Sequence, residues 1–80
     1  MVTRICILTI PGRGSLTGKV TTGNPTTDVP IEYTGDQSLL SRPWPAASPA
    51  FLKVIFTNIA AKQGGTVTVH DEGQYDLWDE

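Results

Sequence analysis

The chain has 80 residues, and with 39% hydrophobic and 18% charged residues it is too apolar to be intrinsically disordered. Its length allows one domain, residues 1–80, and its single cysteine, Cys6, excludes an internal disulfide. The net charge is −2, but residues 63–80 carry five acidic residues and no Lys or Arg, so the negative charge is concentrated at the C-terminal end.

The first part of the chain is expected to form a β-hairpin. Residues 2–10 (VTRICILTI) are rich in β-branched side chains and place apolar residues on both faces. This pattern predicts a central strand that is covered at least in part on both sides, with Cys6 as a buried thiol. Turn residues follow at 11–15 (PGRGS), and residues 16–22 (LTGKVTT) predict the second strand.

A third strand and an irregular connection are expected next. Residues 29–34 (VPIEYT) alternate apolar and polar side chains, and Pro30 places this strand at an edge because proline has no N–H to donate. Residues 36–47 are irregular, since prolines flank Trp44 on both sides. We expect Trp44 either to cap the core or to serve as a preorganised aromatic anchor for a protein partner.

An amphipathic helix is predicted over residues 48–64. Ser48 is a good N-cap, Pro49 suits the first helical position, and Gly64 suits the C-terminal stop. Apolar residues recur at helical spacing and predict the packed face, namely Leu52, Ile55, Phe56 and Ile59, widened by Phe51 and Ala60.

Two further strands are predicted after the helix. Residues 66–70 (TVTVH) alternate with a period of two, residues 71–73 form a turn, and residues 74–78 return as a last strand. The order β-β-β-α-β-β predicts an α+β fold, a small antiparallel sheet with one amphipathic helix packed on one face.

No catalytic or metal-binding motif is found. A phosphate-binding loop would need glycine at position 13 and Ser or Thr at position 20, where the chain has Arg13 and Val20. His70 is the only histidine, and one Cys with one His cannot make a structural zinc site. We therefore expect no enzyme activity, no cofactor and no metal.

No targeting or membrane segment is predicted. No stretch approaches the roughly 20 apolar residues that span a bilayer, and the short apolar run near the start lacks a signal-peptide cleavage site. We expect no membrane partner and a cytoplasmic location, which would be the host cytoplasm if the gene belongs to a phage.

The acidic C-terminal segment is the most informative feature of the sequence. Residues 71–80 (DEGQYDLWDE) interleave carboxylates with Tyr75, Leu77 and Trp78. This pattern indicates either a final strand with a solvated end or a surface that meets a basic protein partner. On the second interpretation, the expected partner-binding residues are Trp44, Asp71, Glu72, Tyr75, Asp76, Trp78, Asp79 and Glu80.

Two resemblances suggest a function. Residues 58–73 (NIAAKQGGTVTVHDEG) resemble the helix-to-hairpin ending of some small bacterial and phage domains. In kind, as a short, acidic, single-domain and non-catalytic chain, the protein resembles phage-encoded inhibitors of bacterial defence, including anti-CRISPR proteins. The resemblance implies an acidic face that blocks a basic nucleic-acid channel on its target.

Two alternatives stay open. The first is a structural or assembly protein, such as a virion or filament component, that self-associates as a homo-oligomer through the strand edge at residues 29–34. The second is a nucleic-acid-binding module. It is less favoured because the six Lys and Arg residues are dispersed and the acidic end would repel phosphate.

Overall fold

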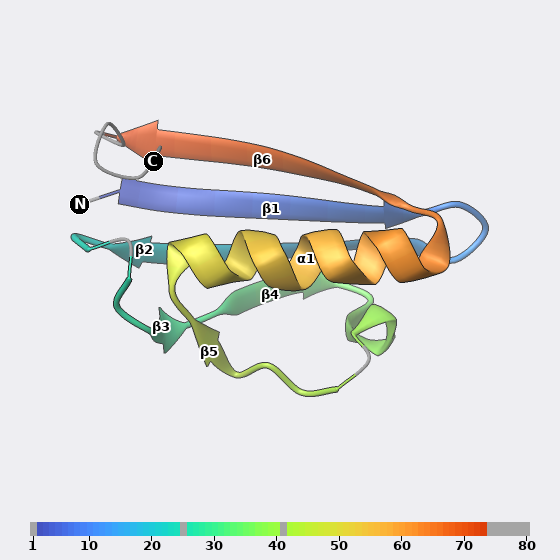
Figure 1. Cartoon of the computed structure of the whole chain (residues 1–80), viewed down its shortest axis with the longest axis horizontal. Helices are drawn as coiled ribbons and strands as arrows, with labels where there is room; N and C mark the ends of the chain where they lie inside the picture. Colours follow the sequence, from blue (N-terminus) through green and yellow to red (C-terminus); the bar gives the residue numbers. More distant parts are fainter. Residues whose placement is uncertain (1, 25, 41, 74–80) are drawn as a thin grey trace.

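The computed structural model describes residues 2–24, 26–40 and 42–73. These residues form an α+β fold in which one helix lies across one face of a four-stranded antiparallel sheet, as the sequence predicts (Figure 1). The strand order in this sheet is β4-β2-β1-β6, and a second, two-stranded sheet pairs β3 with β5. The elements are β1 (Val2–Ile10), β2 (Gly14–Thr22), β3 (Val29–Pro30), β4 (Glu32–Gly35), the short 3-10 helix η1 (Gln37–Leu39), β5 (Ala46–Ala47), α1 (Pro49–Gln63) and β6 (Thr66–Gly73).

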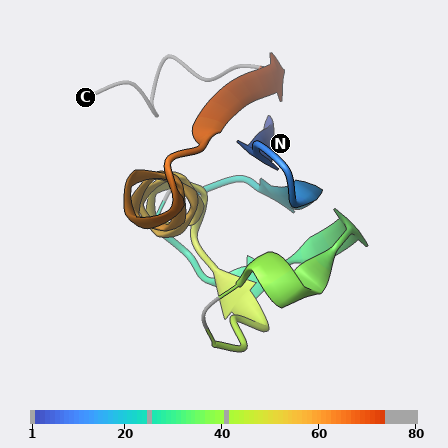
Figure 2. The same ribbon diagram turned by 90° about the vertical axis from the view of Figure 1, so that its right-hand side faces the viewer.

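β1 is a central strand, as predicted, because it pairs with β2 on one side and with β6 on the other. Its alternate side chains face α1 and are buried, whereas Ile5 and Ile7 face the other way and are only half-buried. No described helix or loop covers that second face of the sheet (Figure 2). The sequence predicts cover at least in part on both sides, and among the described residues the partial burial of this face comes from neighbouring side chains on the sheet.

The core lies between α1 and the covered face of the sheet. The predicted stripe on α1 is buried, and Phe56 packs directly over β2 at Gly18, where an added Cβ would lie 2.7 Å from Phe56 Cζ. The ends of α1 also follow the prediction: Ser48 Oγ accepts a hydrogen bond from the Phe51 N–H at 3.2 Å, and Gly64 adopts a left-handed φ of 71°.

The predicted strand at residues 29–34 is divided between two sheets. β3 pairs with β5, whereas β4 pairs with β2 at the edge of the main sheet. Ile31, which joins the two strands, is buried and donates its N–H to the Pro45 carbonyl at 3.1 Å. The division occurs next to Pro30, which has no N–H to continue a single ladder.

The predicted turn at residues 71–73 is wrong. These residues belong to β6, and they pair with the start of β1, where Gly73 lies opposite Val2. The nine-residue length of β1 explains the difference, because it offers a partner to β6 along its whole length. The predicted last strand, residues 74–78, lies outside the described residues.

The buried thiol of Cys6 leads to a pH-dependent prediction. Burial raises the pKa of Cys6 from 9.0 to about 11. Between these values the unfolded chain ionises and the folded chain does not, so the free energy of unfolding should fall by roughly 2 kcal/mol as pH rises from 9 to 11. Urea denaturation of the wild-type protein and Cys6→Ala across this range isolates the contribution of Cys6. An equal pH dependence in both proteins would contradict the prediction.

Candidate protein-binding groove

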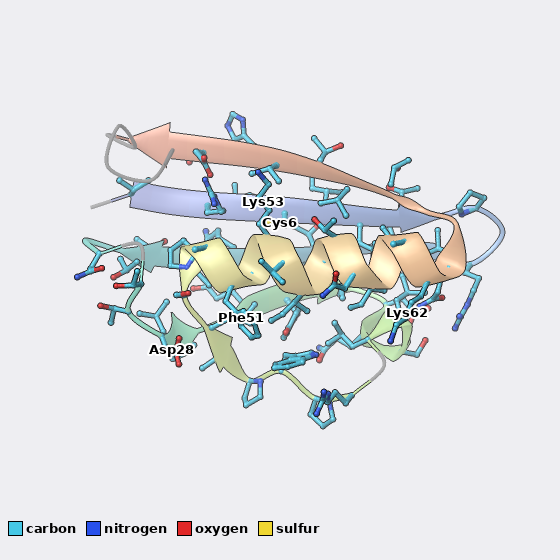
Figure 3. All side chains as sticks on the ribbon, viewed as in Figure 1. Cys6, Asp28, Phe51, Lys53 and Lys62 are labelled. Atoms are coloured by element: carbon cyan, nitrogen blue, oxygen red, sulfur yellow. The ribbon has the colours of Figure 1, made fainter. Side chains whose placement is uncertain are left out.

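A groove runs along the side of α1 that faces the loop before β5, the segment between η1 and β5 that contains Arg42 and Trp44. It has a volume of about 250 Å³, and Figure 3 shows two of its lining residues, Phe51 and Lys62, near opposite ends of α1. The lining consists of Arg42, Trp44, Phe51, Val54, Ile55, Asn58, Ile59 and Lys62. The loop and the helix thus form the two walls of the groove.

Two aromatic residues that line the groove, Trp44 and Phe51, are partly exposed. Trp44 and Phe51 meet edge to face, with ring centroids 5.5 Å apart and an interplanar angle of 75°. Phe51 is 42% exposed and Val54 is 47% exposed, and they are the exposed large hydrophobic residues of the described chain. Trp44 is half-buried and packs against the core, while the rest of its side chain is accessible. This position is compatible with both predicted roles, a cap on the core and an aromatic anchor for a partner.

The prediction that Phe51 widens the buried stripe is wrong. One residue along a helix turns the side chain by about 100°, so Phe51 points away from the sheet while Leu52 points into the core. The side chain packs on Trp44 instead. Tertiary packing of the loop gives Phe51 its only aromatic neighbour among the described residues.

Hydrogen bonds from the strands and the helix hold the loop in place. The Tyr33 hydroxyl, on β4, donates to the Trp44 carbonyl at 2.5 Å. Burial raises the pKa of Tyr33. At the other end of the loop, Gln63 Nε2 donates to the Leu39 carbonyl at 3.2 Å. Trp44 is therefore positioned by the fold itself, before any partner binds.

The rim of the groove is positively charged. The Arg42 guanidinium carbon lies 4.9 Å from the centroid of the Trp44 ring, and Lys62 lies at the C-terminal end of α1. No carboxylate is found among the residues that line the groove. A groove lined by apolar residues together with two cations suits an apolar side chain next to an acidic group.

The two predicted acidic residues that the structure describes point to opposite faces of β6. Asp71 faces α1 and forms a bidentate ion pair with Arg4, in which Nε–Oδ1 and Nη2–Oδ2 are both 2.7 Å. Glu72 faces the uncovered side of the sheet, 3.3 Å from His70 Nε2, with 62% of its side chain exposed. Asp71 therefore stabilises the fold, and Glu72 is the carboxylate of the two that is open to a partner.

Most of the other predicted partner-binding residues fall outside the part of the chain that the structure describes. Tyr75, Asp76, Trp78, Asp79 and Glu80 lie outside the described residues. Trp44 is separated from β6 by α1, which lies between β6 and the loop before β5 (Figure 2). The groove thus contains one of the residues predicted to bind a partner, Trp44, and seven that sequence reasoning did not select.

A signal for the groove is present in the sequence. Phe51, Val54, Asn58 and Lys62 follow one another at spacings of three or four residues, which defines a second stripe on α1 beside the buried one. The stripe begins with two apolar residues and ends with a cation. The spacing does not reveal the other wall of the groove, because that wall is formed by Arg42 and Trp44 in the loop before β5.

Residues 2–24, 26–40 and 42–73 contain no group of three His, Cys, Asp or Glu side chains that could hold a metal ion. Within the same ranges, no helix has the length and apolar character needed to cross a membrane. No protein-family model, curated protein or solved structure matches this chain.

Proposed function

We propose that this domain is a small, non-catalytic protein-binding module that docks on its partner through the groove beside α1. The observation that carries the proposal is the exposure of Phe51 and Val54 next to Trp44 in a preformed groove. Partly exposed aromatic side chains held in place by the fold are typical of the anchors that dominate binding energy at protein interfaces.

The chemistry of the groove favours a protein segment over a small molecule. Its volume of about 250 Å³ lies below the roughly 300–1,000 Å³ of typical small-molecule sites. This space accommodates one or two apolar side chains of a partner. The cations at the rim, Arg42 and Lys62, favour a carboxylate beside those side chains.

A narrower proposal concerns the acidic C-terminal end of the chain. On this proposal the protein is a phage-encoded inhibitor of a bacterial defence complex, similar in kind to anti-CRISPR proteins, and blocks a basic surface in the host cytoplasm. The concentration of five acidic residues in 63–80 supports it. Because Asp71 is paired with Arg4, the basic partner would meet Glu72 and the acidic residues beyond Gly73.

The experiment that tests the groove is site-specific photo-crosslinking. A benzophenone amino acid at Phe51 is expected to capture one defined partner in lysate of the cells in which the protein acts. The same group at Thr21, an exposed residue on the uncovered face of the sheet, should capture none. The affinity of the captured partner is then measured for a set of variants of the unmodified protein.

The variants separate the groove from the acidic end. Trp44→Ala is expected to weaken binding at least about tenfold, as for an aromatic anchor, and Arg42→Glu should weaken it further. Thr57→Ala changes an exposed residue of α1 that does not line the groove, and it is the control. If Trp44→Ala leaves affinity unchanged, the groove is not the docking site. If neutralising Asp76, Asp79 and Glu80 lowers affinity instead, the narrower proposal is supported.

A further inference from the structure

The two edges of the main sheet differ in how they are protected. β4 is four residues long, follows Pro30 closely, and ends at Gly35, where φ is 114°. β6 is eight residues long, and its first four residues, Thr66 to Val69, are β-branched with no proline or lysine. Short strands, prolines and charges are the usual protection of an exposed edge. β4 has this protection, and no described residue pairs with the outer edge of β6.

The outer edge of β6 is also the open end of the apolar layer under α1. Val67 and Val69 are partly buried and pack against the core cluster. Thr66, Thr68 and His70 alternate with them on the uncovered face and are exposed. A strand added at this edge would extend both the hydrogen-bond ladder and the apolar layer.

The sequence of β6 is complementary to itself in the antiparallel register that is centred on Thr68. In an antiparallel pair of identical strands related by a two-fold axis, each residue lies opposite a residue that faces the same side of the sheet. The residue at the axis therefore lies opposite its own copy. With Thr68 at the axis, Val67 lies opposite Val69 of the second copy. With Val69 at the axis, Val67 would lie opposite Asp71, and with His70 at the axis, Val69 would. Both registers are less favourable because the Asp71 carboxylate is already paired with Arg4.

We propose that two copies of this chain pair through β6 about a two-fold axis at Thr68, forming one continuous eight-stranded sheet. The paired segment, Thr66 to His70, is short, so the interface is smaller than the roughly 1,200 Å² of stable complexes. The dimer is therefore reversible, and its population depends on protein concentration. The groove is lined by α1 and the loop before β5. This loop lies on the far side of α1 from β6 (Figure 2), so the groove stays accessible in this dimer.

Sedimentation equilibrium of the full chain tests the dimer. The average mass is expected to rise from 8.6 kDa toward twice that value as concentration increases. Thr68→Lys places two lysines opposite each other at the axis and should weaken association at least about tenfold, since like charges directly opposite are destabilising.

Thr34→Lys is the matched control. Thr34 lies in the same cross-strand row as Thr68, through Thr17 and Ile7, and both are exposed on the uncovered face. It belongs to the protected edge, so this variant should associate like the wild-type protein. Equal weakening by both lysines would overturn the proposal, because it would indicate a general effect of charge on that face.

A disulfide between copies provides a second measurement. Thr68→Cys should form a cross-linked dimer under mild oxidation, whereas Thr34→Cys should not, and the native Cys6 is buried and does not compete. A monomeric mass at every concentration would overturn the proposal. In that case, slow amide hydrogen exchange along β6 would indicate that the same chain covers its own edge.

Discussion

Replacing Phe56 with alanine is expected to lower the free energy of unfolding by about 3 to 5 kcal/mol. Phe56 is fully buried between α1 and the sheet, and it is the largest completely buried side chain of the described chain. Domains have a total stability of about 5 to 15 kcal/mol, and a short chain with a thin core lies toward the lower end. Urea denaturation followed by circular dichroism should therefore show a protein close to unfolding without denaturant.

The contact between Phe56 and Gly18 gives this prediction a specific control. A Cβ at Gly18 would lie 2.7 Å from Phe56 Cζ, so Gly18→Ala alone should destabilise the fold by about 1 to 3 kcal/mol through overpacking. Phe56→Leu removes the clashing atoms. The double variant Gly18→Ala, Phe56→Leu should be more stable than the sum of the single changes predicts. Simple additivity would show that the ring does not rest on Gly18.

Replacing Arg4 with methionine is expected to destabilise the protein by about 3 to 5 kcal/mol. The side chains of Arg4 and Asp71 are 7% and 12% exposed, and two hydrogen bonds of 2.7 Å join them. Without the guanidinium, the Asp71 carboxylate stays buried without this ion pair. The penalty comes from that charge, and the loss of the attraction alone would be smaller. Thermal or urea unfolding measures the change.

Two further variants test the cause. Arg4→Met combined with Asp71→Leu removes both charges and should recover most of the lost stability, because an apolar pair can replace a buried ion pair. Lys19→Met breaks an exposed ion pair, in which Lys19 Nζ lies 3.9 Å from Glu32 Oε1, and should change stability by less than about 1 kcal/mol. If the double variant is as unstable as Arg4→Met, the buried charge is not the cause.

In the sequence, the acidic residues of 71–80 form one continuous negative segment, but the structure separates the two that it describes, Asp71 and Glu72. Asp71 and Glu72 are neighbours in a strand, so they face opposite sides of the sheet. The prediction of a turn at residues 71–73 concealed this separation. Strand length depends on the partner strand, and here β1 extends β6 to Gly73.

Local sequence determined the helix, the first hairpin and the fold class. The ends of α1 depend on Ser48, Pro49 and Gly64, and the buried stripe depends on helical spacing, which are properties of neighbouring residues. These interactions form within one element, so they can be derived from the chain alone.

The groove and the uneven protection of the sheet edges were decided by the tertiary structure. The groove needs the hydrogen bond from Tyr33 to the Trp44 carbonyl, which joins residues of two elements and places Trp44 beside Phe51. The edge of β6, with which no described residue pairs, needs the strand order β4-β2-β1-β6, in which β6 lies outside the first hairpin. Both depend on contacts between segments distant in sequence, and periodicity within one segment carries no information about which distant segment it will meet.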